Sequence, residues 1–431
     1  MIKSVITWVM LTVMAMGGHG KEATELQMAG VLHAYPYLDS VPPAQTAAPE
    51  GYKAFHIEHY GRHGSRYLLS DQDYAVPVKN LEKAEKEGLL TPLGKKTLDF
   101  LRKSQKEARG RLGQLTPKGA LQHQAIGRRM AQNFPEIFQP GATLTAKSTV
   151  VERCKESMDN ALTGIAAVSP GLPFEKGSGE EYMWFMNYRD KPALALRDKV
   201  NKEVLDHYRD SVMGSLTFIG RLVTDEKFGA EKVMPGLLPR LFWVLSASQN
   251  LDGQPCLLEE VFGHEDLVKN WNYGNARRFL LGGNSAMTRG RMPYTQRNLL
   301  GRIIECADKA IDSGTPGANL RFGHDDVLMP LLVLMELRNF GREINSFEAL
   351  ETSGWNDYDI TPMAGNLQLI FYRPEGEFSS DDVLVKALIN EEEVAMPATP
   401  VTGPYYHWND LKSLYLNKLI SFTEKFGPDS R

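Results

Sequence analysis

Three arginines and two histidines in this 431-residue sequence could together act on a phosphate group. His63 lies between Arg62 and Arg66 in a glycine-containing turn, and Arg153 and His324 follow much later in the chain. The planar guanidinium of arginine matches phosphate oxygens in pairs. An imidazole that is unprotonated near neutral pH can attack phosphorus. These residue types indicate a site that binds phosphate and supplies a nucleophile without a metal.

Cleavage of a phosphate ester also needs an acid, because the departing alkoxide is a poor leaving group. Asp325 and Asp326 directly follow His324, and either could supply the proton. The transition state spreads negative charge over three oxygens, which the arginines would neutralise. We expect one aspartate to donate the proton and the other to cap the helix that follows.

The ends of predicted strands carry most of these side chains. An apolar-rich run predicts a buried strand at about 53–59, ahead of His63. Alternation predicts a strand at 143–148, and a third strand leads to His324. In open α/β sheets the site lies beyond the carboxyl ends of the strands, so these segments are expected to meet there.

Two helix starts are readable nearby. Thr116 followed by Pro117 is typical of a helix N-terminus. Thr149 with Glu152 three residues later has the pattern of a capping box. Such a cap would place Arg153 close to a helix N-terminus, where the helix dipole adds to its positive field.

Strand-to-helix units at both ends of the chain enclose a helical middle. This pattern predicts an α/β fold with a central mixed sheet, flanked by helices and interrupted by an inserted α-helical domain. We expect a signal peptide at 1–20, an extended leader at 21–50, an α/β core formed by 51–169 and 316–431, and an α-helical insertion at 170–315.

Four motifs resemble those of the histidine phosphatase superfamily, in its acid phosphatase and phytase branch. They are YGRHGSRY at 60–67, which matches the signature RHGxR, LTPKG at 115–119, STVVERCKES at 148–157 and FGHDDVLMPLL at 322–332. They occur in family order and cover both ends of the chain, whereas the middle third matches only loosely. Within the branch, the motifs look most like those of the multiple inositol polyphosphate phosphatases.

The resemblance implies a phosphomonoesterase that needs no cofactor and forms a phosphohistidine on His63. It implies that Arg62, Arg66 and Arg153 bind the phosphate oxygens, with His324 as a further donor. The expected partner is a small phosphate monoester, with inositol phosphates such as phytate and sugar phosphates as candidates.

The resemblance leaves two readings of the acid. Phytase-like members place aspartate directly after the second histidine, which favours Asp325. Inositol polyphosphate phosphatases have His-Ala-Glu there, which makes Asp326 the alternative. The branch usually has proline two residues after the second arginine of RHGxR, where this chain has Leu68. That departure concerns the path of the loop.

Composition narrows the function classes further. The net charge of −4 offers no basic excess for a nucleic acid backbone. A lysine, an apolar run and small residues within 1–20 are typical of a secretory signal peptide, so we expect export to the periplasm or the medium. No apolar run reaches the roughly 20 residues of a membrane span. Three cysteines allow at most one internal disulfide.

Other readings of the same residues stay open. A phosphoryl transferase or mutase could use the same nucleophile, and a non-catalytic protein could bind polyanions. His56, His59 and His63 could suggest a metal-dependent hydrolase, although a strand would not bring them together, and we assign no metal ligand. His123 is expected to be structural, and Cys154 packed and inert. Two arginine pairs, at 128–129 and 277–278, are expected on solvated faces or in ion pairs, unless a polyanionic ligand recruits them.

Overall fold

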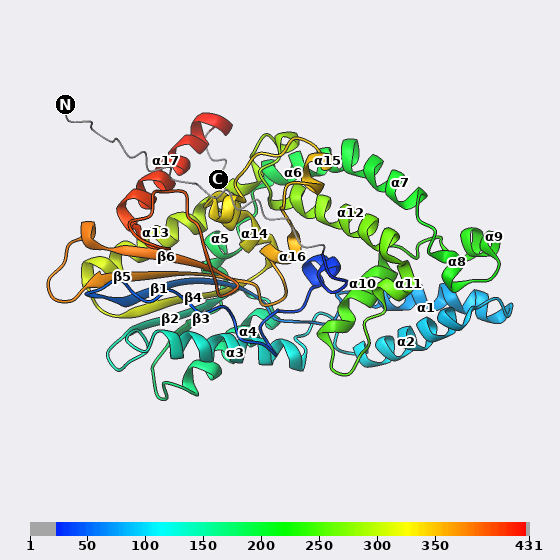
Figure 1. Cartoon of the computed structure of the whole chain (residues 1–431), viewed down its shortest axis with the longest axis horizontal. Helices are drawn as coiled ribbons and strands as arrows, with labels where there is room; N and C mark the ends of the chain where they lie inside the picture. The colour runs from blue at the N-terminus through cyan, green and yellow to red at the C-terminus, as the bar shows by residue number, and fades with distance from the viewer. Residues whose placement is uncertain (1–22, 428–431) are drawn as a thin grey trace, which may run out of the picture.

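An eight-stranded sheet lies in one half of the computed structural model, which describes residues 23–427 (Figure 1). The strand order is β3-β2-β4-β1-β5-β6-β7, and β8 pairs with β6. The strands are β1 Tyr52–Arg62, β2 Thr143–Ser148, β3 Glu175–Gly177, β4 Gly317–Gly323, β5 Asn366–Pro374, β6 Leu384–Ile389, β7 Glu392–Val394 and β8 Tyr406–His407. Strands β1 to β4 run parallel, and β5 to β8 pair antiparallel. The predicted mixed sheet is therefore confirmed.

Helices cover both faces of the sheet and continue beyond it (Figure 1). The first group is α1 Asp71–Lys86, α2 Pro92–Ala108, α3 Pro117–Asn133, α4 Glu152–Ala166, α5 Met183–Met186, α6 Lys191–Val200, α7 Asp206–Gly214, α8 Ile219–Leu222 and α9 Glu226–Phe228. The second group is α10 Arg240–Ala247, α11 Leu258–Phe262, α12 His264–Gly282, α13 Arg297–Ser313, α14 Asp325–Leu334, α15 Phe347–Glu351, α16 Asp357–Ile360 and α17 Trp408–Phe426.

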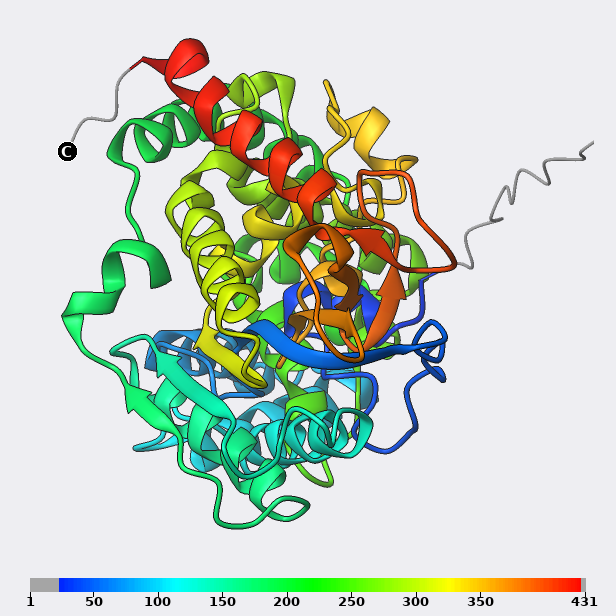
Figure 2. The same cartoon turned by 90° about the vertical axis from the view of Figure 1, so that its left-hand side faces the viewer.

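The alternation of side chains along the strands builds a separate core on each face of the sheet. In β5, Leu369 and Phe371 point into a cluster with α13, α14 and α17. The intervening Ile370 and its neighbour Tyr372 pack with α3 and α4 on the other face. Figure 2 shows α3 and α4 on one side of the sheet and α13 and α17 on the other.

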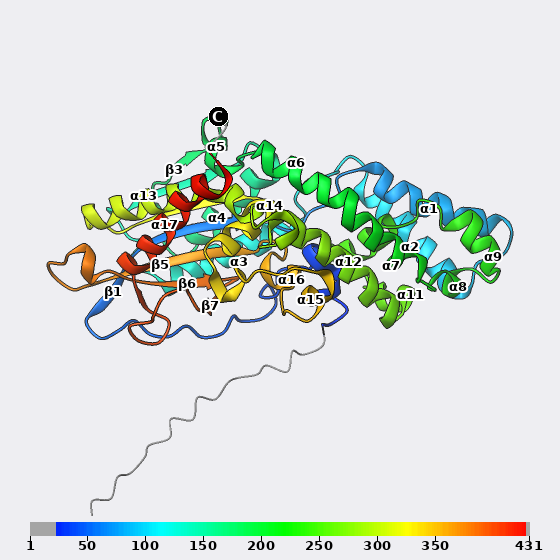
Figure 3. The same ribbon diagram turned by 90° about the horizontal axis from the view of Figure 1, so that it is seen from above.

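A third core lies in the helical part, away from the sheet (Figure 3). It joins α1 and α2 to α8, α10 and α11, so helices from two distant parts of the sequence share one apolar cluster. The division of the chain into the expected domains stays a prediction, as does the signal peptide, since residues 1–20 lie outside the described residues. No helix within 23–427 has the length and apolar character that crossing a bilayer requires.

The register of three parallel strands brings the candidate residues to one edge. Gly61 of β1 and Ser148 of β2 both pair with Phe322 of β4. The backbone N–H of His63 then donates to the Gly323 carbonyl (2.9 Å), so His63 and His324 leave neighbouring strands at the same level. Strand β1 runs to Arg62, beyond the expected 53–59, because its last residues still pair with β4 and β5.

Two glycines let the loop after His63 lie directly on the start of α3. A Cβ at Gly64 would come within 2.5 Å of the Gly119 carbonyl oxygen, and a Cβ at Gly119 within 2.2 Å of the Ser65 oxygen. Thr116 caps α3 as expected, accepting from the Gly119 N–H (3.1 Å). Its own N–H donates to the Ser65 carbonyl (2.8 Å), which fixes the loop on the cap.

Two local expectations differ from the structure. The leader begins with a buried 3-10 helix, Gln27–Leu32, before it becomes extended, because its apolar residues pack against α10 and α12. The segment 259–283 reads as one helix in the sequence. It is split into α11 and α12 at Gly263, whose φ of 72° only glycine adopts readily.

Replacing Gly119 by alanine should destabilise the fold, because the added methyl meets backbone atoms of Ser65. We expect Gly119→Ala to lower the free energy of unfolding by about 2 kcal/mol and to displace the loop that carries His63. Chemical denaturation measures this. Gly301→Ala, in the middle of α13 with only Leu419 Cδ1 near its Cβ at 3.8 Å, is the matched control and should be neutral or slightly stabilising. Equal stability of the two variants would contradict the packing.

Candidate active site

The imidazole of His63 is only 2% exposed, and three guanidinium groups lie close enough to act on it electrostatically. Arg62 is the last residue of β1, Arg66 follows in the loop, and Arg153 is the second residue of α4. Burial lowers the pKa of His63 well below its ordinary value, and the charges of Arg62, Arg153 and Arg66 lower it further. The four side chains expected to form one site therefore meet.

Within the part of the chain that the structure describes, only one ring nitrogen of His63 makes a hydrogen bond. Its Nδ1 lies 2.9 Å from the carbonyl oxygen of Gly64. A carbonyl can only accept, so Nδ1 carries the proton and Nε2 carries the lone pair. The lowered pKa keeps the ring in this neutral form. His63 is thus a buried, unprotonated imidazole within a positive field, which is the form that a nucleophile requires.

The arginines are held in place yet keep donors unused. Arg62 Nη1 donates to the carbonyls of Val31 (2.6 Å) and Thr361 (2.7 Å). Arg66 Nη1 donates to its neighbouring carbonyl at Tyr67 (2.9 Å). Within the described part of the chain, the buried Nε atoms of these two arginines and of Arg153 have no hydrogen-bond partner. Burial lowers the pKa of Arg66 to about 9, and the repulsion from Arg62 and Arg153 adds to this effect. Such a cluster of buried, unpartnered donors is suited to binding an anion.

His324 faces His63 from the end of β4, with ring centroids 5.8 Å apart and the rings nearly perpendicular. Its Nε2 lies 3.2 Å from the Thr149 hydroxyl. Burial lowers its pKa to about 4, and the charge of Arg153 adds to this effect. The capping-box prediction for Thr149 is wrong: α4 begins at Glu152 with Val151 as an N-cap that makes no side-chain bond. Thr149 instead continues the sheet, donating its N–H to the Phe322 carbonyl (3.0 Å).

The pKa values of the two aspartates are shifted in opposite directions, although the residues are adjacent at the start of α14. Burial acts to raise the pKa of Asp325, but the charges of Arg62 and Arg278 outweigh burial and lower it well below the ordinary value. Burial raises the pKa of Asp326, and the negative charge of Asp325 raises it further. Asp326 pairs with Arg189, which is far from it in the sequence, with 3.6 Å between Asp326 Oδ2 and Arg189 Nη1.

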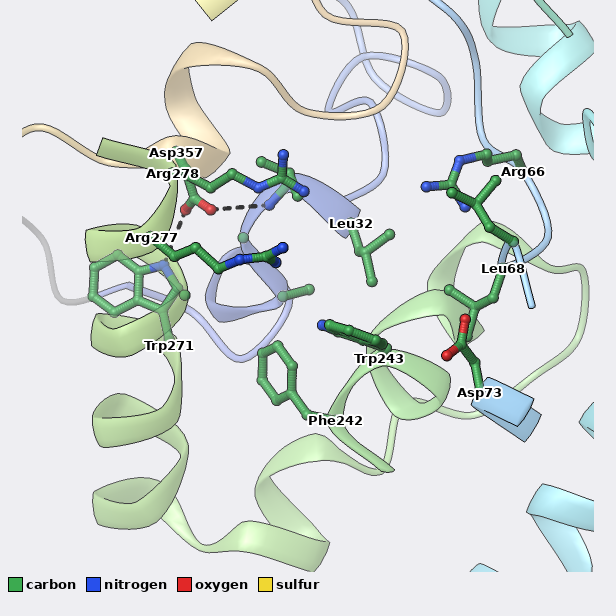
Figure 4. Close-up of a pocket in the computed structure, with 15 residues that line it drawn as sticks. Leu32, Arg66, Leu68, Asp73, Phe242, Trp243, Trp271, Arg277, Arg278 and Asp357 are labelled. Atoms are coloured by element: carbon green, nitrogen blue, oxygen red, sulfur yellow. Dashed lines mark hydrogen bonds between the residues drawn. The ribbon is translucent and has the colours of Figure 1, made fainter. Parts of the chain in front are cut away.

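A cavity of about 260 Å³ opens beside this cluster and is lined partly by Arg66 (Figure 4). Arg277 and Arg278 reach into it from α12, on the side opposite Arg66. Trp243 and Phe242 of α10 form an aromatic wall. The cavity therefore offers arginines at two ends, with the carboxyls of Asp73 and Asp357 also in its wall, and aromatic surface between the ends.

Sequence comparison places this geometry in a family. The profile of the histidine phosphatase superfamily (branch 2) matches residues 61–390. The chain belongs to that superfamily. It is a histidine acid phosphatase, and the resemblance read from its four motifs is confirmed. No curated protein matches the sequence.

Solved structures share the fold of this histidine phosphatase at low identity. The Bifidobacterium longum multiple inositol polyphosphate phosphatase, in complex with inositol hexasulfate, is 19% identical with a TM-score of 0.73, covering 90% of this chain and 97% of that one. The D. castellii phytase is 16% identical with a TM-score of 0.67, covering 94% and 88%. The Citrobacter braakii phytase is 13% identical with a TM-score of 0.54, covering 85% and 98%.

The histidines that could have suggested a metal have other partners in this histidine phosphatase. His56 Nε2 contacts the Glu58 carboxylate at 2.8 Å, and His59 packs its ring against Phe322. Among residues 23–427, no group of three histidine, cysteine or acidic side chains could hold a metal ion. His123 and Cys154 are buried, and burial raises the pKa of the Cys154 thiol to about 11. That Cys154 is inert stays a prediction. All three cysteines are free.

The phosphatase motifs gave no signal for several residues that build the site. The 3-10 helix at 27–32 is pinned by Val31, whose carbonyl accepts from Arg62 and whose N–H donates to the Asp357 carboxylate (3.2 Å). Leu68 replaces the usual proline, and its N–H donates to the Tyr74 hydroxyl (2.9 Å), a bond that proline cannot make. In the sequence, only the run MAGVL at 28–32 could have pointed to a buried role for this helix.

The ring of His63 should stay neutral at pH values where an ordinary histidine becomes charged. We expect no protonation as the pH falls through 6.5, because burial and three arginines oppose the charged form. NMR titration of the chain with ¹³C-labelled histidine measures this, with His63→Asn to assign the signal. An apparent pKa near 6.5 for that signal would contradict the described electrostatics.

Proposed function

We propose that this phosphatase hydrolyses small phosphate monoesters through a phosphohistidine on His63, with inositol phosphates or sugar phosphates as substrates. The observation that carries the proposal is the free Nε2 of His63 among three arginines with unpartnered donors. The relative of known structure that bears inositol hexasulfate supports a polyanionic sugar-like ligand, and the cationic ends of the cavity agree with it.

In this mechanism, Arg62, Arg66 and Arg153 bind the oxygens of the transferred phosphate. Their donors are held by the protein before the substrate arrives, so little reorganisation accompanies the reaction. Nε2 of His63 attacks phosphorus while the bond from phosphorus to the alcohol oxygen breaks. His324 supplies a further hydrogen bond. Water then attacks the phosphohistidine and releases inorganic phosphate.

We propose Asp325 as the proton donor. Its Oδ1 lies 3.8 Å from Nε of Arg62, next to the nucleophile, and its charge interacts with His63. Asp326 stays the alternative, because its raised pKa favours the protonated form that an acid needs. The position next to Arg62 and His63 favours Asp325 as the donor, whereas the raised pKa favours Asp326.

His63→Ala should abolish turnover while the fold is retained. We expect a loss of at least about 10³-fold in kcat, because no other described side chain occupies the position of the nucleophile. Phosphate release from phytate, sugar phosphates and an aryl phosphate measures activity. Quenching the wild-type reaction in alkali should leave a phosphoryl group on the peptide that contains His63, detectable by mass spectrometry.

The same assay separates the other functions. A chelator should leave the rate unchanged. Loss of activity on adding the chelator would indicate a metal-dependent hydrolase. Transfer to an added alcohol without free phosphate would indicate a transferase or mutase. Binding of phosphate esters with no release from any substrate would indicate a polyanion-binding protein.

Asp325→Asn and Asp326→Asn should differ sharply on a substrate with a poor leaving group. We expect Asp325→Asn to lower kcat about 10²- to 10⁴-fold on inositol phosphate, because the alkoxide then leaves unprotonated. The loss on an aryl phosphate should be much smaller. Asp326→Asn should lose less than about tenfold on both substrates. The reverse order of the two variants would assign the acid to Asp326.

A further inference from the structure

Arg278 makes the closest charged contact of the proposed acid. Its Nη1 donates to Asp325 Oδ2 at 2.8 Å, across from α12 to the start of α14. The other carboxylate oxygen, Oδ1, has Arg62 Nε at 3.8 Å. Both oxygens of Asp325 therefore face a guanidinium, which holds the carboxyl in the charged form that cannot donate a proton.

Arg278 also lines the cavity beside Arg66, into which the alcohol part of a substrate with its phosphate on Arg66 would extend. Arg66, expected to bind the transferred phosphate, lines the same cavity from the opposite side. Arg277 lies beside Arg278 in the cavity wall and has no ion-pair partner among residues 23–427. An anionic group elsewhere on the same substrate would therefore meet these two arginines (Figure 4).

A second phosphate group would compete with Asp325 for Arg278. A phosphate carries up to two negative charges and accepts bidentate hydrogen bonds from a guanidinium, so it is a stronger partner than one carboxylate oxygen. Arg278 is about a quarter exposed (26%), so substrate can reach it. When Arg278 turns to phosphate, Asp325 loses a positive neighbour and gains a negative one. Both changes favour its protonated form.

We propose that Arg278 is a positioning residue through which a second anionic group of the substrate converts Asp325 from an ion-paired carboxylate into the protonated acid. This inference rests on the proposed function. It names the preferred substrate class as phosphate esters whose alcohol carries at least one further phosphate, within reach of Arg277 and Arg278. Such substrates gain in the rate of the chemical step as well as in binding.

The reaction balances with solvent as the source of the first proton. Asp325 takes up a proton when the substrate engages Arg278, and it gives this proton to the alcohol oxygen as the phosphorus–oxygen bond breaks. The phosphoryl group is then bonded to Nε2 of His63. In the second step the oxygen of water bonds to phosphorus, the nitrogen–phosphorus bond breaks, and the water proton returns to Asp325.

Several charged groups set the protonation of Asp325 besides Arg278. The cations that face it are Arg62, Arg66 and Arg277. The titratable groups that interact with it are His63, His324, Tyr60 and Asp326. Among the arginines, Arg62 and Arg66 are expected to bind the transferred phosphate in every substrate. The response specific to a second anion therefore depends on Arg278 and its neighbour Arg277.

Arg278→Gln tests the proposal through its pH profile on two substrates. The single-turnover rate of alcohol release is measured against pH with inositol monophosphate and with inositol hexakisphosphate. On the monophosphate, we expect the alkaline limb of the variant to move up by about one pH unit or more relative to wild type, because Asp325 has lost an ion-pair partner. On the hexakisphosphate the limb should stay in place, while affinity falls about tenfold. Because the profiles of wild type and variant are compared on the same substrate, ionisation of the substrate contributes equally to both and does not affect the shift between them.

Two further variants complete the experiment. Arg302→Gln removes the same charge from the surface of α13, where Arg302 pairs with Glu305 (3.0 Å), and should leave both profiles unchanged. Arg278→Lys keeps the charge without the planar fork, so its monophosphate limb should lie between those of wild type and Arg278→Gln. It also provides the comparison if the glutamine variant fails to fold.

Several outcomes would overturn the proposal. In one, the monophosphate limb stays fixed in both Arg278 variants. In another, the limbs on the two substrates shift equally, which would make Arg278 a general electrostatic neighbour. An equal drop in rate on both substrates without a shift would make it a purely structural residue. Wild-type protein that releases no phosphate from either substrate would instead refute the proposed function.

Discussion

The central constraint in this structure is that several arginine side chains of like charge are buried close together. Burial lowers the pKa values of Arg62, Arg66 and His63, and the positive charges of the neighbouring arginines lower them further. The fold opposes this repulsion with fixed acceptors, such as the Val31 and Thr361 carbonyls on Arg62. What remains is an excess of positive potential, which a bound phosphate dianion would neutralise. Under the proposed function, this potential contributes to affinity for substrate.

The sheet makes this arrangement possible by aligning three strand ends. Because β1, β2 and β4 are parallel and in register, their last residues lie at one level. His63, His324 and the turn into Arg153 leave the sheet there. The helical part supplies the opposite side, with Arg278 on Asp325 and Arg189 near Asp326. Each aspartate therefore pairs with an arginine from outside the sheet, and under our proposal this pairing couples the proton donor to the ligand in the cavity.

Much of this could be predicted from the sequence, where local patterns determine the structure. Alternation placed β2 at its observed residues, and the Thr116-Pro117 pair correctly marked the start of α3. The signature around His63 predicts the residue that we propose as the nucleophile. The capping-box prediction for Thr149 was wrong because it used a local pattern only. The Thr149 hydroxyl instead contacts His324, and this contact depends on strand register, which a local pattern does not report. The pairing of Arg278 with Asp325 spans 47 residues and depends on how α12 packs, which no local pattern reports.

The most direct measurement of the central claim is a crystal structure of the chain with inorganic phosphate bound at neutral pH. The account predicts phosphate at the end of β1, with its phosphorus in line with Nε2 of His63 and its oxygens held by Arg62, Arg66 and Arg153. Phosphate bound elsewhere, with those three guanidiniums turned away from His63, would contradict it.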